Sequence, residues 1–452
     1  FKKDGHQLSV DFSTSFNKDD SNSFIFDIDD QTTENVQRQS RNLAQLDYVL
    51  PLTENSRFEA GYRGDFTKVL TDFEVFTDIG STGNFTLDTN LSNVFEYKEY
   101  VNAFYTQFGS KINKFSYLFG LRWEDSNIGV NLISGDNYNT KRYNNFFPSA
   151  FFAYEISDKS NVTLSYSRRI QRPRGRFLNP TANISSNINI FQGNPDLDPA
   201  MTHAIDLGYL KRWNKLTFNT SAYINKTDDV FQFIRRESGE IFENWIDENN
   251  NAIVDPGEVT QIPIILSGPI NLATEYRFGF EFTLNYTPYK WWRLNGNFNF
   301  FRNELKGNYN YTNFQGDPVS INLDNVATSW FARINSKITL PYKIDWQTNA
   351  TYNAPQTNAQ GRSLGVISAN LAFSKDILKE KGTLALNVSD VFNSRKRIME
   401  TNLRNVSSYS EMQWRVRQIN LTFTYRFNKA KNEKERMPRR EGGDDGDFMG
   451  RP

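Results

Sequence analysis

The sequence predicts an all-β protein, a transmembrane antiparallel β-barrel with short periplasmic turns and long extracellular loops. The first observation is an alternation of apolar and polar side chains over about ten to fifteen residues at a time, because a strand points successive side chains to opposite faces. The second is the aromatic content of 15%, with 38 Phe and 21 Tyr, which suits lipid-facing positions and interfacial girdles. The third is the order of the connections, in which short turns alternate with long polar loops.

The alternation of side chains places the individual strands. It is clearest near the end of the chain, where Leu421, Phe423, Tyr425 and Phe427 alternate with polar residues. Applied to the whole chain, it predicts about sixteen strands. They lie near residues 6–17, 39–52, 56–70, 94–110, 114–125, 143–155, 159–169, 199–210, 215–233, 269–286, 291–302, 326–340, 343–354, 360–375, 381–394 and 411–427.

The connections between these strands predict the orientation. Turns such as 53–55, 111–113 and 289–290 are very short, whereas most of the intervening connections are about fifteen to thirty-five residues long. Outer-membrane barrels have short periplasmic turns and long extracellular loops. We therefore expect an integral protein of the outer membrane of a Gram-negative bacterium, with its C-terminus in the periplasm.

Aromatic residues gather at the short turns: Trp213, Trp291, Trp292, Tyr342 and Trp346 all lie at or beside one. An amphipathic ring is most stable at the level of the lipid head groups. The shared position predicts a periplasmic interfacial belt.

The pattern stops after Phe427. Residues 429–440 are rich in Lys, Arg and Glu, and residues 441–452 are rich in Gly and Asp. Such a segment cannot bury enough apolar surface to fold. We therefore expect a barrel portion at 1–427 and a disordered, charged periplasmic tail at 428–452.

Composition excludes several classes of protein. A mean hydropathy of −0.63 and 23% charged residues exclude a helical membrane protein, which needs runs of about eighteen apolar residues. A formal net charge of zero gives no argument for a nucleic-acid partner. The absence of Cys removes disulfides, thiolate metal sites and cysteine nucleophiles.

The sharpest local motif is the segment 247–258, DENNNAIVDPGE. Its oxygen-bearing side chains follow the twelve-residue spacing of a calcium loop, although Ala252 replaces the usual turn glycine, which costs about 1 kcal/mol in a left-handed conformation. The plainer interpretation is an acidic, Asn-rich surface turn. We expect structural Ca²⁺ that orders a long loop, with oxygen ligands from Asp247, Asn249, Asn251, Ile253, Asp255 and Glu258.

A second group of motifs carries a family resemblance. Residues 168–173 read RRIQRP, and LNP at 178–180 and QGNPDLDP at 192–199 follow. Pro fixes φ and Asn bonds its own backbone, so this loop should be rigid. Together with FPSA at 147–150 and LSYS at 164–167, the group resembles the barrel of TonB-dependent receptors, and within them the outer membrane protein β-barrel family. The final strand also looks like the signal by which the insertion machinery recognises barrels.

The resemblance implies active import through a barrel of about twenty-two strands, with an N-terminal plug that TonB pulls. This sequence shows about sixteen strands, no plug segment and no TonB box, so we expect Phe1 to lie inside a longer barrel. The function expected is energised uptake of a nutrient or chelate, and the ligand is an unidentified small molecule, peptide or glycan. A closed porin-like channel, or a surface adhesin scaffold, is the alternative.

Catalysis has little support in the sequence. His6 and His203 are the only histidines, they lie on different predicted strands, and both are expected in the periplasmic halves of these strands. Outer-membrane hydrolases need Asp/His or Ser/His groupings. We therefore expect no catalytic residues and no enzyme. The Asn- and Tyr-rich segment 308–314 could stack on a ligand, but packing of its own aromatic rings is the simpler expectation.

Overall fold

The computed structural model describes residues 5–25, 30–80, 82–89, 91–135, 137–180, 188–245, 259–312, 316–403 and 407–427. Nearly all of these residues form β-strands, and the single α-helix among them is α1 (Gly175–Leu178). None of the described helices is long and apolar enough to cross a membrane.

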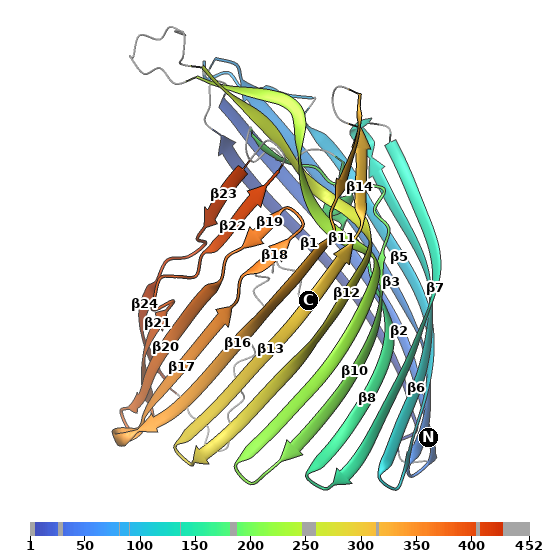
Figure 1. Ribbon diagram of the computed structural model, residues 1–452, viewed down its shortest axis with the longest axis vertical. Helices are drawn as coiled ribbons and strands as arrows, with labels where there is room; N and C mark the ends of the chain where they lie inside the picture. The colour runs from blue at the N-terminus through green and yellow to red at the C-terminus, as the bar shows by residue number, and fades with distance from the viewer. Residues whose placement is uncertain are drawn as a thin grey trace.

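The main sheet is an antiparallel meander, in which each strand is hydrogen-bonded to the next one along the wall (Figure 1). Of its 18 strands, β4 (Thr86–Leu87) and β9 (Asn189–Phe191) are short additions, and the other sixteen form the wall. Each predicted strand corresponds to one of them, so the predicted fold class is confirmed. The wall strands are β1 (Gln7–Ile25), β2 (Asp30–Thr53), β3 (Ser56–Asp78), β5 (Asn93–Ile112), β6 (Phe115–Leu132), β7 (Asn137–Ser157), β8 (Ser160–Gln171), β10 (Ala200–Arg212), β11 (Leu216–Trp245), β12 (Val259–Tyr289), β13 (Trp292–Lys306), β16 (Asn325–Leu340), β17 (Ile344–Asn353), β20 (Val366–Ile377), β21 (Gly382–Ser389) and β24 (Gln418–Tyr425).

The wall is a curved sheet of tilted strands with two different ends (Figure 1). Tight turns join the strands at the lower end, which we call the turn end, and the long connections gather at the upper end, the loop end. Among the described residues, β1 pairs only with β2 and β24 pairs only with β21. The wall is therefore open along one seam, and Phe16 on β1 and Leu421 on β24 are 79% and 69% exposed.

The two faces of the wall differ as the alternation predicts. On β12, Phe280 and Phe282 lie on one face, and Glu281 between them lies on the other. Phe298 on β13 lies directly opposite Phe282, and Phe218 on β11 lies diagonally from it, so that Phe282 packs between the two rings with centroids 6.0 and 6.1 Å away. Such cross-strand pairs stabilise a sheet. We call the two sides the apolar face and the polar face.

The rings predicted at the tight turns lie there. Trp213, Trp291 and Tyr342 are exposed at the turn end. Tyr289 stacks on Trp291 with ring centroids 5.1 Å apart and planes 1° from parallel. The expected gathering of rings at this end is confirmed.

The hairpin of β11 and β12 is longer than predicted. These strands have 30 and 31 residues and stay paired as far as Trp245 and Val259, whereas the sequence predicts strands only at 215–233 and 269–286. Gly and Pro normally weaken a strand. Here the register of β11 shifts between Glu237 and Ile241, around Gly239, whose φ is 92°. The two strands pair again beyond this shift.

The last four wall strands do not run unbroken into the loops. A second sheet continues them past a break, so the predicted strands 360–375, 381–394 and 411–427 are each interrupted. At one break Asp390 has a φ of 51° and its carboxylate accepts hydrogen bonds from the backbone N–H groups of Ser394 and Arg395. This side-chain capping competes with the ladder and ends the strand. The second sheet consists of β18 (Gln356–Asn358), β19 (Gly361–Ser363), β22 (Arg397–Asn402) and β23 (Ser407–Met412). A third, two-stranded sheet is the hairpin of β14 (Asn308–Thr312) and β15 (Pro318–Asn322).

Candidate functional site

The polar face of the wall has two halves with different chemistry. On β2, β3, β5 and β6 it carries charged side chains held in pairs. The Arg41 Nη2 atom lies 2.5 Å from the Asp65 carboxylate, and Arg122 Nε lies 2.6 Å from Glu124. Paired charges of this kind present both signs to whatever occupies the interior, without a large net field.

The other half, on β12, β13, β16 and β17, carries a ladder of asparagines. Asn285, Asn295, Asn335 and Asn349 lie opposite one another on these successive strands. The Asn295 amide donates to Asn285 at 2.6 Å, Asn335 donates to Asn295 at 3.3 Å, and Asn349 donates to Asn335. Each amide has both donors and acceptors, so this ladder offers neutral hydrogen-bonding groups that suit hydroxyl or peptide groups.

The connection between β8 and β10 folds back onto the wall. Its backbone is tied to itself, with the Gly193 N–H donating to the Asn179 carbonyl at 2.9 Å and the Asn194 N–H to the Phe177 carbonyl at 2.7 Å. Its strand β9 pairs in parallel with β12. A Cβ atom at residue 193 would lie 2.3 Å from the Asn179 carbonyl oxygen, so glycine permits this close approach. These bonds tie the described parts of the connection to each other and to β12.

Arg172 anchors the start of this loop, whose described parts, residues 172–180 and 188–199, we call the anchored loop. Its Nη2 atom donates to the Glu124 carboxylate at 2.5 Å and to the Ser126 hydroxyl at 2.7 Å, and its Nε lies 3.5 Å from Glu99. The Arg172 and Glu124 side chains are 17% and 8% exposed. Buried charges persist when they are paired and hydrogen-bonded, so this pair fixes the loop to β6.

Lys141 and Asn271 anchor the other end. The Lys141 ammonium donates to the carbonyl oxygens of Asp196 and Leu197 at 2.6 and 3.2 Å and lies 2.8 Å from the Asp198 carboxylate. The Asn271 amide accepts from the Asp198 N–H at 2.8 Å and donates to the Asp198 carbonyl at 2.9 Å. The anchored loop is therefore held by β7 on one side and by β12 on the other.

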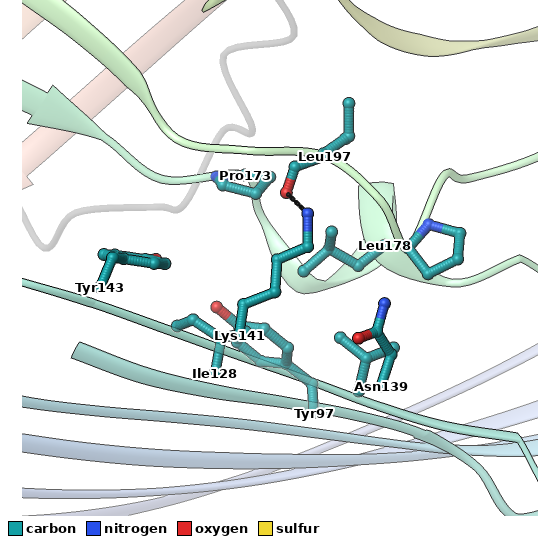
Figure 2. Close-up of a pocket in the computed structure, with 10 residues that line it drawn as sticks. Tyr97, Ile128, Asn139, Lys141, Tyr143, Pro173, Leu178 and Leu197 are labelled. Carbon is teal, nitrogen blue, oxygen red and sulfur yellow. Dashed lines mark hydrogen bonds between the residues drawn. The ribbon is translucent and has the colours of Figure 1, made fainter.

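An apolar layer lies beneath the anchored loop (Figure 2). Leu178 and Leu197 from the loop are 2% and 1% exposed and pack on Tyr97 and Ile128 of the wall. The space between them is about 10 Å³, which is about the room that one water molecule needs. This layer holds the loop in place, and it is too tightly packed to receive a ligand.

Cationic side chains gather at the loop end. The Gln360 amide accepts from the Arg235 N–H at 2.8 Å and donates to its carbonyl at 2.7 Å, and Arg235 donates to the Thr401 hydroxyl at 2.8 Å. Burial, and then the neighbouring Arg397 guanidinium, lower the pKa of Arg235 from its ordinary value. Within the described part of the chain, neither guanidinium lies within ion-pair distance of a carboxylate, so this surface, the mouth cluster, suits an anionic group.

The predicted aromatic loop lies beside the mouth cluster. Tyr309 and Tyr311 on β14 stack with centroids 5.5 Å apart, and Tyr309 packs against the cluster of buried apolar residues around Leu272. The Arg236 guanidinium lies 5.2 Å from the Tyr311 ring centroid. These rings pack on their own chain, as the simpler interpretation of the segment expects.

The predicted calcium loop, residues 247–258, lies outside the described residues. Calcium binding by Asp247, Asn249, Asn251, Ile253, Asp255 and Glu258 therefore stays a prediction. The segment connects β11 to β12 at the tip of the longest hairpin. Elsewhere, across the described ranges, no three His, Asp or Glu side chains are grouped to hold a metal ion.

The two histidines lie apart. His6 precedes β1 at the turn end and hydrogen-bonds the Tyr48 hydroxyl at 3.0 Å, as its predicted position requires. The prediction for His203 is wrong, because β10 begins at Ala200 and runs from the loop end to the turn end. His203 therefore lies near the loop end, where its Nδ1 is 2.9 Å from the Tyr166 hydroxyl.

Sequence reasoning identified the anchored loop but missed the residues that hold it. Arg172 lies in the predicted motif, whereas Glu124, Lys141 and Asn271 come from distant strands. A polar residue in the alternation pattern has no visible partner until register is known. The one usable signal was their placement near the loop ends of predicted strands.

The comparisons with known proteins agree on the fold. A family model described as "Outer membrane protein beta-barrel family" matches residues 1–425. The ferric citrate transporter FecA in its unliganded form has a TM-score of 0.58 at 12% sequence identity, over 94% of this chain and 59% of that chain. The siderophore receptor PiuA from Acinetobacter baumannii has a TM-score of 0.62 at 13% sequence identity, over 94% of this chain and 62% of that chain. The ferric yersiniabactin uptake receptor FyuA from Yersinia pestis has a TM-score of 0.56 at 12% sequence identity, over 92% of this chain and 58% of that chain.

This chain therefore spans about three-fifths of the length of those structures, from 58% to 62%. At such low sequence identity the likeness concerns the fold alone. None of the curated proteins matches the sequence.

Proposed function

Because this chain belongs to the outer membrane protein beta-barrel family, we propose that it is the C-terminal barrel portion of a TonB-dependent receptor. Such a receptor takes up a scarce nutrient or chelate with energy relayed through TonB. The observation that carries the proposal is the match of 94% of the chain to the barrels of a ferric citrate transporter and a siderophore receptor. In this proposal a plug domain outside residues 1–452 contacts TonB.

The open seam supports a longer barrel. Unpaired backbone groups are very costly in lipid, so a spanning sheet has to close. Closure requires either that β1 pairs with β24 or that further strands of the same protein fill the gap. The second route agrees with the share of the similar structures that this chain spans, 58–62%.

In the proposed mechanism the loop end faces the outside and the tail at 428–452 lies in the periplasm. The mouth cluster, with Arg235 and Arg397, contacts the ligand first. The polar face then offers weak, replaceable contacts, from paired charges on one half and from the asparagine ladder on the other. The final strand β24 provides the contact for the insertion machinery, and lipid surrounds the apolar face.

Conductance and TonB contact test this proposal. We expect the complete protein, plug included, to show no steady conductance in planar bilayers and to crosslink with TonB in cells. A receptor is closed at rest because its plug fills the barrel, whereas a passive porin stays open. Steady conductance without a TonB crosslink would contradict the proposal and favour the porin.

The alternative is a closed sixteen-strand porin or surface adhesin scaffold, which an even strand number permits. Paired cysteines distinguish the two, because the native chain has no Cys. We expect no disulfide when Ser13→Cys on β1 is combined with Asn420→Cys, Thr422→Cys or Thr424→Cys on β24. The control, Ser149→Cys with Ser167→Cys, joins residues that lie opposite each other on β7 and β8 and should oxidise readily. Oxidation of any seam pair would establish closure at sixteen strands.

We also propose that residues 247–258 bind structural Ca²⁺, on the basis of the oxygen spacing and of their place between β11 and β12. Glu258→Gln removes the bidentate carboxylate of the last ligand position. We expect calorimetry on the whole protein to show Ca²⁺ binding for the wild type and at least about tenfold weaker binding for this variant. Equal heats for the two proteins would contradict the proposal.

A further inference from the structure

Register brings three basic side chains together on the apolar face. Arg168 on β8 lies opposite His203 on β10, and His203 lies opposite Lys226 on β11. The three share that face with Ile205 and Ile224, which are exposed. We call Arg168, His203 and Lys226 the basic row.

The basic row lies toward the loop end of the apolar residues. On each strand, the side chain two positions nearer the turn end is apolar or aromatic: Tyr166, Ile205 or Ile224. Cationic and phenolic groups at such a border suit lipid head groups, because their stems stay in the apolar layer while their polar ends reach water. Ile170 and Met201 border the row on its other side.

Several other cations on this face have a matching acid. Lys68 and Lys98 lie 2.6 Å from the two oxygens of Glu96. Arg142 lies 3.1 Å from Asp125, and Arg302 lies 2.7 Å from Glu304. These groups neutralise one another.

Arg168 differs from those cations. Among the described residues no carboxylate lies within ion-pair distance of it, its Nη1 donates to the Phe146 carbonyl at 3.0 Å, and its buried Nε has no acceptor. The acid of the row is Asp228, 3.1 Å from Lys226. The basic row therefore has a surplus of positive charge, which comes from Arg168, on the apolar face of the wall.

We propose that the basic row binds the phosphate group of an anionic outer-leaflet lipid. Arg168 and Lys226 supply the charge, and His203 and the Tyr166 hydroxyl add hydrogen bonds. Phosphate is the anion that lipid head groups present at this depth, and guanidinium binds it with charge-assisted hydrogen bonds. The inference uses the proposed orientation of the wall but does not depend on uptake.

The test measures lipid bound to the purified complete protein by native mass spectrometry. The probes are phosphorylated lipid A, dephosphorylated lipid A and inorganic phosphate. Arg168→Gln combined with Lys226→Gln should lower the affinity for phosphorylated lipid A on the order of tenfold or more, since each cation near a membrane surface contributes about a fivefold factor. Arg142→Gln combined with Arg302→Gln is the matched control, because it removes two cations of the same face that lie outside the basic row, and it should change affinity little.

Arg168→Lys keeps the charge and should retain most of the binding, which separates loss of charge from loss of folding. Unchanged heat-modifiable migration of all variants is the check on assembly. Equal binding of the two lipid A forms, an equal loss in the matched control, or binding of inorganic phosphate as tight as that of the lipid would each overturn the proposal. None of these outcomes bears on TonB contact or conductance, so this inference and the proposed function fail separately.

Discussion

Arg172→Ala is expected to release the anchored loop from the wall. The substitution leaves the buried Glu124 with Arg122 as its remaining ion-pair partner, and breaking a buried ion pair from one side costs up to about 3–5 kcal/mol. The Arg172 contacts at 2.5 and 2.7 Å join the loop to β6 directly, so this cost falls on docking of the loop. Hydrogen exchange in residues 188–199 measures it, and we expect protection there to fall by at least about a hundredfold.

Two controls define that result. Arg174→Ala removes a nearby exposed arginine of the same loop and should leave protection unchanged. Arg172→Met combined with Glu124→Leu removes both charges of the pair. This double variant should lose less protection from hydrogen exchange than Arg172→Ala alone, because no buried carboxylate is left without Arg172. Equal protection in wild type and Arg172→Ala would mean that the Lys141 and Asn271 contacts alone hold the loop.

Phe423→Arg is expected to impair membrane assembly. Phe423 lies on the apolar face of β24, opposite Leu384, and is exposed. An arginine on the lipid face costs about 2–4 kcal/mol at the midplane and about 0–1 kcal/mol near the interfaces, and Phe423 lies two residues from the turn-end limit of β24, so we expect a cost between these values. The measurement is heat-modifiable migration of protein extracted from membranes, in which the folded fraction should fall.

Thr422→Arg is the matched control for this strand. Thr422 is the neighbour of Phe423 and lies opposite Ala385, on the polar face of β24. An arginine there should be tolerated, because that face meets polar groups. If both variants assemble as the wild type does, the assignment of the two faces is wrong.

Alternation of side chains was sufficient to find the wall, because one face of every strand meets the membrane and the other does not. Alternation did not predict the parts of the strands that extend beyond the membrane, because the two faces no longer differ there. Beyond the apolar band, strands such as β11 are held by backbone pairing and by contacts among the loops. Residues 234–245 carry mixed charges and a glycine, so only the partner strand reveals that they are extended.

The candidate site also combines features that local sequence predicts with contacts that only the fold reveals. Local rules predicted a rigid loop from its Pro and Asn residues, and the described parts of this loop are hydrogen-bonded to each other and to the wall. They could not predict that Arg172 pairs with Glu124, 48 residues away, because that contact depends on how the loop folds back over the wall. The asparagine ladder could not be predicted either, because each Asn is an ordinary polar residue of its strand and only the register of the strands shows that the four lie opposite one another.

The open seam has a kinetic consequence. Every wall strand pairs with the next wall strand along the sequence, so the pairs that are joined by tight turns close short loops and can form early. Sealing the seam is different, because it brings together segments from opposite ends of the protein. We therefore expect it to be the slowest step of barrel formation, and until it happens a free strand edge such as that of β24 can template aggregation with other chains.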